Sequence, residues 1–135
     1  MDNRRAALIK ESWGLIEERG PELADSFYDR LFQLDPRIRD LFAAAEMESQ
    51  QVKFVVMLGE VVRLVQDPER FASLLADSGR KHAGYGVMAR HYRVVGEALL
   101  WALDHAIPGG LDGETREAWA EAYTRMSFLM QQAAA

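Results

Sequence analysis

The sequence contains no cysteine, only three histidines and four prolines among its 135 residues. Without cysteine the chain can form no disulfide, no iron–sulfur cluster and no cysteine nucleophile. It also lacks any apolar run approaching the roughly 20 residues that span a bilayer, so we expect no membrane partner. Three dispersed histidines without cysteine also offer no zinc-ligand cluster.

The charge and the length of the chain narrow further the kind of protein that it can be. The chain has 21 acidic and 16 basic residues, a net charge of -5, and its basic residues are scattered, so we expect no nucleic-acid partner. Apolar residues make up 49% and charged residues 27%, which is ordinary for a soluble globular protein. We expect one domain over residues 1–135, with no second domain, in a cytoplasmic monomer or weak homodimer.

The spacing of apolar residues predicts helices. Ile9, Trp13 and Ile16 recur at helical intervals, and no segment alternates with period two between hairpin signals. The pairs Asp35–Pro36 and Asp67–Pro68 each combine an N-cap with a proline suited to a first helical turn. The sequence therefore predicts an all-α fold of about seven to eight helices joined by short turns.

A loop is expected over residues 43–48. The long helix that follows is expected to have Ser49 as its N-cap. The helix that begins near Pro68 places Phe71, Leu75, Ser78 and His82 on one face, at intervals of 4, 3 and 4. From the residues alone, a single histidine on an apolar face is more often a core residue than a ligand.

Several intervals match a known family. Tyr28 and Phe42 are 14 residues apart, Gln50 precedes His82 by 32, and Tyr92 follows His82 by 10. Over about residues 5–132 the chain resembles bacterial single-domain globins, the globin portion of flavohaemoglobins and, through residues 79–82 and 115–119, neuroglobin. The resemblance implies the globin fold around a haem pocket.

The resemblance also implies the cofactor and its ligand. His82 would be the proximal ligand of haem iron, with the sixth position open to O2, CO or NO. Because there is no cysteine, the haem would be a non-covalent haem b. His91 and His105 lack matching context and are interpreted as surface or helix-edge histidines.

On the distal side the resemblance implies a hydrogen-bond donor at Tyr28, with Gln50 as a second donor and Phe54 as the apolar neighbour. Gln51 would serve instead of Gln50 if the register differed by one residue. A donor to a bound gas would contribute roughly 1.5–3 kcal/mol and slow O2 release about 10- to 150-fold. Tyr28 could equally be a core tyrosine, and we expect Phe27 and Tyr28 to point in different directions.

Other positions are expected to contact the haem. Phe42 resembles the phenylalanine that wedges against the porphyrin, and Lys53 is either a partner of a haem propionate or a solvated lysine. Trp119, Met126 and Leu129 are expected in the core. The remaining expected haem contacts are Leu75, Val87, Tyr92 and Val95.

Two departures from the relatives affect function. No second histidine lies on the distal side, so bis-histidine ligation is not expected. No acid follows Glu121, so the chain lacks the proximal carboxylate that would make the ligand more basic, which weakens a peroxidase assignment.

Three functions follow from this. The first is reversible O2 binding or scavenging, and the second is nitric oxide dioxygenation, which would need an external reductase. Redox or gas sensing would follow if a side chain filled the sixth iron position. A non-haem helical interaction module is the remaining alternative, and failure to bind haem would identify it.

Overall fold

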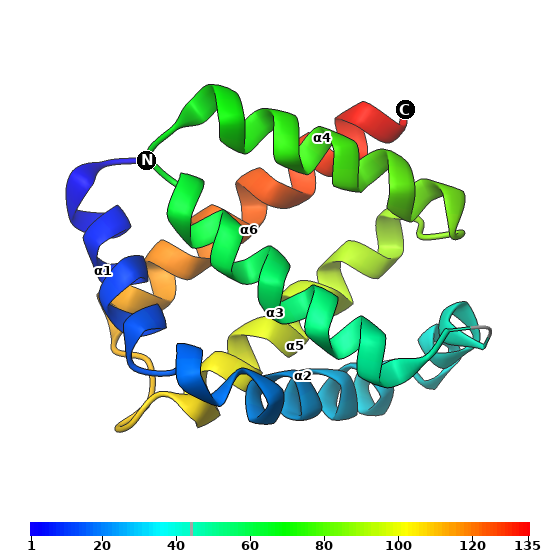
Figure 1. The fold of residues 1–135 in the computed structure, drawn as a ribbon, viewed down its shortest axis with the longest axis horizontal. Coiled ribbons are helices and arrows are strands. Elements are labelled where there is room, and N and C mark those ends of the chain that lie inside the picture. Colours follow the sequence, from blue (N-terminus) through cyan, green and yellow to red (C-terminus); the bar gives the residue numbers. More distant parts are fainter. Residues whose placement is uncertain (44) are drawn as a thin grey trace.

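The computed structural model describes residues 1–43 and 45–135, and within them it contains helices and turns but no strand (Figure 1). The helical elements, in chain order, are α1 (Asn3–Gly14), η1 (Glu17–Arg19), α2 (Gly20–Leu34), η2 (Pro36–Phe42), α3 (Met47–Leu64), α4 (Pro68–Gly84), α5 (Ala89–Ala106) and α6 (Gly113–Ala134). Six α-helices and two 3-10 helices confirm the all-α prediction. No helix in the described part of the chain is long and apolar enough to cross a membrane.

Aspartates begin four of these helices. The side chains of Asp2, Asp67 and Asp112 each accept a hydrogen bond from a backbone N–H in the first turn of the helix that follows. Asp35 does the same for η2, accepting from the N–H of Arg37. Each side chain satisfies a donor that the helix itself leaves free, and the expected caps at Asp35 and Asp67 are confirmed.

The start of α3 differs from the prediction. The helix begins at Met47, with Glu46 as its N-cap and no side-chain cap, so Ser49 lies in the first turn. The expected N-cap at Ser49 is therefore wrong. A serine is a good cap only where the backbone changes direction, and here the helical backbone already extends two residues further towards the N-terminus.

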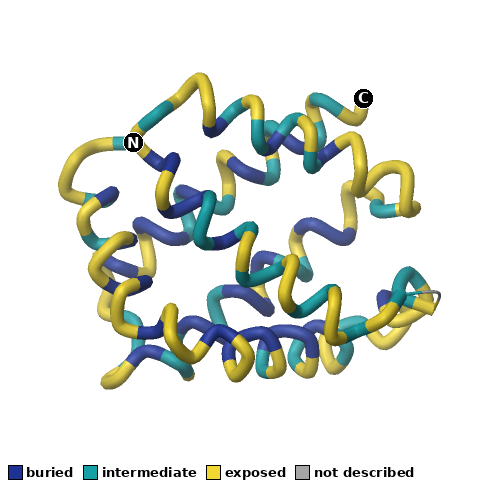
Figure 2. The backbone as a smooth tube through the Cα atoms, viewed as in Figure 1, coloured by how far each residue is buried: buried dark blue, intermediate teal, exposed yellow. Residues whose placement is uncertain are grey.

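The helices pack in pairs that come from distant parts of the chain. Helix α4 lies against α6, α2 against α5, and α1 against α6. Figure 2 shows buried residues following one another along α2 and α5, where these helices face the interior. At Gly79 a Cβ would overlap the backbone of Met130, so glycine allows α4 and α6 to approach at backbone distance.

Two groups of buried side chains form the core. The larger joins α1, α2, α3, α5 and α6, and it includes Trp119 and Tyr28. The smaller lies between α3, α4, α5 and α6, and it includes Leu75, Tyr92 and Met126. Trp119 and Met126 are buried as expected, and Leu129 is partly buried against the smaller group.

His91 is not the surface residue that the sequence suggested. It lies in the first turn of α5, only 7% exposed, and its Nδ1 accepts a hydrogen bond from the N–H of Met88 at 2.8 Å. Burial lowers the pKa of His91, and the nearby Arg90 lowers it further, while Asp35 raises it and Arg37 lowers it. A neutral ring is required, since a protonated Nδ1 cannot accept this bond.

We expect His91 to make the protein less stable in acid. Because the folded-state pKa lies below the ordinary value of 6.5, the unfolded chain takes up a proton first. The free energy of unfolding should be level above about pH 6.5 and fall as the pH drops towards the folded-state pKa. Urea unfolding between pH 7.5 and 5.0 measures the free energy of unfolding at each pH. Loss of the hydrogen bond from Met88 to His91 should lower it by about 1 kcal/mol.

His91→Gln keeps an acceptor that does not titrate, and it should flatten this part of the pH profile. His105→Gln removes an exposed histidine and serves as the control. A His91→Gln profile that falls as steeply as the wild type would exclude His91 as the group responsible.

Candidate functional site

His82 lies in the last turn of α4, exposed, with its imidazole held by the turn before it. Its Nδ1 lies 2.7 Å from the carbonyl oxygen of Ser78 and 3.3 Å from the Ser78 hydroxyl. A carbonyl can only accept, so Nδ1 carries the hydrogen of this bond. In the neutral ring the lone pair is then on Nε2, at the outer edge of the imidazole, which is the state that a metal ligand needs.

Across the molecule from this helix, rings from α2, η2 and α3 form a distal aromatic cluster. Tyr28 makes edge contacts with Phe42 and Phe54, with ring centroids 5.6 and 5.8 Å apart. Phe27 stacks on Phe54 at 4.2 Å, and Phe32 packs edge-on against Phe42 at 5.7 Å. The structure therefore brings together three predicted site residues that are up to 26 positions apart.

Phe27 and Tyr28 share a neighbour although they are adjacent in the sequence. Both side chains are buried, both rings contact Phe54, and the two rings also meet edge-on with centroids 5.0 Å apart. Successive residues on a helix diverge by about 100°, and large rings can still meet beyond that divergence.

The Tyr28 hydroxyl is a neutral donor without a strong partner. Burial raises the pKa of Tyr28 to about 12, so the hydroxyl keeps its proton at neutral pH. It lies 3.5 Å from the backbone carbonyl oxygen of Gln50, which is longer than an ordinary hydrogen bond between oxygen atoms. The hydroxyl is therefore available to a better acceptor.

The two glutamines at the start of α3 have different surroundings. The side-chain amide of Gln51 donates to the carboxylate of Asp25 on α2, at 2.6 Å. Gln50 is half-buried, and its backbone faces the Tyr28 hydroxyl. Asp25 thus fixes Gln51 on the outer side of the α2–α3 contact, which leaves Gln50 as the glutamine nearer to the distal aromatic cluster.

Three of the other expected haem contacts share the smaller core group. Leu75 is fully buried, Tyr92 is nearly so, and Val87 packs against them from the α4–α5 connection. The hydroxyl of Tyr123 on α6 donates to the backbone carbonyl of Tyr92, which anchors this part of α5. Val95 lies one turn further along α5 and packs against the larger core group instead.

Lys53 and the last acid of the chain lie away from this arrangement. Lys53 is exposed on α3, and no ion pair involves it within the described residues. Glu121 in the first half of α6 pairs with Arg5 of α1, so this carboxylate is engaged away from His82. The groups in contact with the His82 ring nitrogen are the hydroxyl and carbonyl of Ser78.

Sequence reasoning did not predict the roles of Ser78, which holds His82, and Asp25, which holds Gln51. Ser78 stands four positions before His82, a spacing that brings a backbone carbonyl close to the later side chain in a helix, so its bond to His82 could have been predicted. Asp25 could not have been found in this way, because its contact with Gln51 crosses between helices that the sequence does not align.

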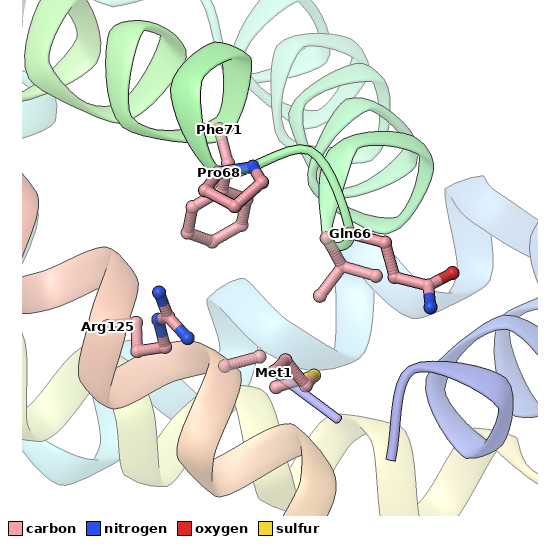
Figure 3. Close-up of a pocket in the computed structure, with 7 residues that line it drawn as sticks. Met1, Gln66, Pro68, Phe71 and Arg125 are labelled. Atoms are coloured by element: carbon pink, nitrogen blue, oxygen red, sulfur yellow. The ribbon is translucent and has the colours of Figure 1, made fainter. Parts of the chain in front are cut away.

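A small pocket lies elsewhere on the molecule (Figure 3). It is bounded by Met1, Gln66, Pro68, Phe71 and Arg125, at the opposite end of α4 from His82. None of the predicted haem-contacting residues borders it. We therefore place the candidate site along the His82 end of α4 and the distal aromatic cluster, and assign no role to this pocket.

The residues present fit a haem. An imidazole with a fixed Nδ1 hydrogen can supply an axial ligand, and the partly buried Phe42 and Phe54 and the buried Leu75 can supply the apolar contacts that a porphyrin requires. The Tyr28 hydroxyl adds a single polar group in otherwise apolar surroundings. This combination of a few placed polar groups within an apolar lining is typical of cofactor sites.

Solved structures share this fold. A bacterial globin from Campylobacter jejuni superimposes with a TM-score of 0.85 at 21% identity, covering 98% of this chain and 96% of that one. A hexacoordinated heme protein from an anhydrobiotic tardigrade, determined at pH 4, gives a TM-score of 0.88 at 14% identity and covers 99% and 95%. At such identities the likeness establishes the fold.

Curated relatives include flavohemoproteins. That of Xylella fastidiosa strain Temecula1 is 32% identical over 127 residues, which are 92% of this chain and 32% of the relative. That of Bordetella pertussis is 29% identical over 126 residues, again 92% of this chain but 31% of the relative. The chain therefore spans about a third of the length of these proteins.

The family itself is established by a broader match. The globin family model matches residues 25–130, which include α3, α4 and α5 entirely and both the distal aromatic cluster and His82. Together with the helical architecture, this match shows that the chain belongs to the globin family.

Proposed function

We propose that this globin holds a non-covalent haem b through His82 and binds O2 reversibly on the side of Tyr28. The observation that carries the proposal is the bond from His82 Nδ1 to the Ser78 carbonyl, because it fixes the orientation of the ring and leaves the lone pair of the neutral imidazole on Nε2. Haem, when bound, supplies the iron at which a diatomic gas binds.

The protein would hold the cofactor largely by apolar contact. Phe42 would pack against one face of the porphyrin, while Leu75, Val87 and Tyr92 would line the side of the proximal ligand. Val95 and Lys53 would contact the periphery. Cysteine is absent from the sequence, so attachment through thioether bonds is impossible and the b type is the one that fits.

On the distal side, Tyr28 would donate to the bound gas and Phe54 would keep water out. The neutral hydroxyl has only a long contact with Gln50, so turning towards a better acceptor costs little. Gln50 would be the second donor, since the Gln51 amide already bonds to Asp25. Two donors would retain O2 tightly, which suits scavenging better than delivery.

The first test is haem retention. His82→Ala should abolish stable haem binding, because no other histidine occupies the same end of α4. His105→Ala is a matched control, because His105 is also exposed and its Nδ1 also bonds to the carbonyl four residues earlier. Soret absorbance per protein measures the outcome, and a His82→Ala variant with full haem content would exclude this ligand.

The second test is O2 release. Tyr28→Phe should speed O2 dissociation about 10- to 150-fold, since it removes a hydrogen bond of roughly 1.5–3 kcal/mol. Stopped-flow displacement of O2 by CO measures the rate, and Tyr85→Phe, at an exposed tyrosine, is the control. An unchanged rate in Tyr28→Phe would remove this residue from the distal role.

The similarity to flavohemoproteins favours a second candidate function, nitric oxide dioxygenation. Oxidation of NO by O2 to nitrate consumes one electron per turnover, so the reaction needs a reductant. The part of the flavohemoproteins that matches this chain is only about a third of their length, and an external reductase would supply the electron here. The residues proposed for O2 binding would have the same roles in nitric oxide dioxygenation.

Nitrate formation distinguishes the two functions. With haem-loaded protein in catalytic amount, O2, NO and a reductase, we expect many equivalents of nitrate per haem if the protein is a dioxygenase. His82→Ala, assayed with the same reductase, controls for nitrate formed without the protein. One equivalent or less of nitrate per haem, despite an active reductase, would leave reversible O2 binding as the function.

A further inference from the structure

The distribution of charge around His82 differs from that of the chain as a whole. The protein carries a net charge of -5, yet residues 78–96 contain no aspartate or glutamate. The same stretch contains four cations, Arg80, Lys81, Arg90 and Arg93, all of them exposed. The end of α4 and the start of α5 are therefore the basic part of an acidic protein.

In the folded chain, η2 lies beside the end of α4 and the start of α5. An ideal Cβ at Gly86 would lie 3.6 Å from Leu41, so the α4–α5 connection touches η2. The pKa of His91 responds to both Asp35 and Arg37, which places η2 beside the start of α5 as well. In Figure 1 the α4–α5 connection and η2 both lie at the right side of the molecule, one above the other.

We call this region the basic corner. Its six cations share exposure and proximity to the α4–α5 connection, and they are Arg37, Arg39, Arg80, Lys81, Arg90 and Arg93. Four carboxylates lie among or beside them, on Asp35, Asp40, Asp77 and Glu97. The corner thus has an excess of positive charge.

The cations of the basic corner are only partly neutralised. Lys81 pairs with Asp77 at 3.2 Å, Arg37 pairs with Asp35 at 3.2 Å, and Arg93 lies 3.8 Å from Glu97. The side chains of all three cations are largely exposed, so these pairs contribute little and leave the cations accessible. Arg80 and Arg90 have no carboxylate partner within the part of the chain that the structure describes.

Two large apolar side chains stand exposed between the cations. Tyr85 is 71% exposed and Met88 is 53% exposed, and both belong to the α4–α5 connection. They stand in the chain between Lys81 and Arg90, and Arg90 contacts the Met88 sulfur at 3.2 Å. Tyrosine, methionine and arginine are the residues enriched at protein–protein interfaces. The basic corner therefore combines an apolar contact area with positive charge, which favours a partner that carries negative charge.

We propose that the basic corner docks an electron-donating protein through an acidic face of that partner. The inference rests on the proposed haem function, in which oxidised iron must be reduced again. Arg80 and Lys81 directly precede His82 in the chain, so a donor bound here lies next to the iron ligand. Opposite charge would steer the encounter, as it does for charged partners in general.

Charge reversal tests the docking. The variant Arg90→Glu with Arg93→Glu changes the charge by the same amount as the control Arg116→Glu with Arg125→Glu. The control arginines are exposed on α6, where no ion pair involves them among the described residues. The probe is an acidic plant-type [2Fe–2S] ferredoxin, used oxidised for titration calorimetry and reduced for stopped-flow reduction of the ferric haem protein.

In dilute buffer we expect the corner variant to weaken ferredoxin binding and to slow bimolecular haem reduction, each about 10-fold. The control should change either quantity less than about twofold. At about 0.5 M salt, where the Debye length is a few ångströms, the difference should largely disappear. This pattern would support the basic corner as the docking surface.

Three results would overturn the inference. Equal binding and reduction in the corner and control variants, with haem content intact, would exclude the corner while leaving the proposed function standing. Self-association in sedimentation that the corner variant alone abolishes would assign the surface to a second copy of the chain. Failure of the wild-type protein to retain haem would overturn the proposed function and this inference together.

Discussion

The close approach of α4 to α6 at Gly79 is the constraint on which the candidate site depends. Because glycine has no side chain, the backbone of α4 rests against that of Met130, and this contact fixes how α4 is rotated. Leu75, Ser78 and His82 lie on one side of α4, within about 60° of one another around its axis. The rotation set by the contact with α6 places Leu75 in the core, whereas His82, two turns later on the same side, is exposed.

The parts of the fold that the sequence predicted are those set by local rules. Asp35 and Asp67 begin helices because an aspartate cap and a proline act within one turn, and the structure confirms both. The prediction of Ser49 as the N-cap of α3 failed because local rules did not decide it. Several positions could cap this helix, and only the packing of α2 against α3 selects among them. The burial of His91 was not predicted because it depends on tertiary packing: Asp35 and Arg37, whose charges act on its pKa, are more than 50 residues earlier in the chain.

The candidate site divides in a similar way. The intervals that link Tyr28, Phe42 and His82 were visible in the sequence, and the structure brings Tyr28 and Phe42 into ring contact. The contacts of Phe54 with both Phe27 and Tyr28 were not visible in the sequence, because they depend on how α3 packs against α2. The Asp25–Gln51 bond likewise exists only once these two helices are in register. Residues that hold others in place are thus harder to predict than the residues they hold.

The proposed function makes opposite electrostatic demands on two parts of the structure. Burial preserves the proton on Tyr28 and leaves a neutral donor among phenylalanines, where the proposed gas ligand would bind. Around His82, the proposed iron ligand, the end of α4 carries the exposed cations Arg80 and Lys81. A globin whose iron must be reduced by another protein needs both, a dry face where the gas binds and a charged, exposed face where the electron arrives. Residues 80–86 are all exposed, so with His82 as the proposed ligand this end of α4 would be open to a protein that delivers the electron, while the ring cluster around Tyr28 stays buried or partly buried.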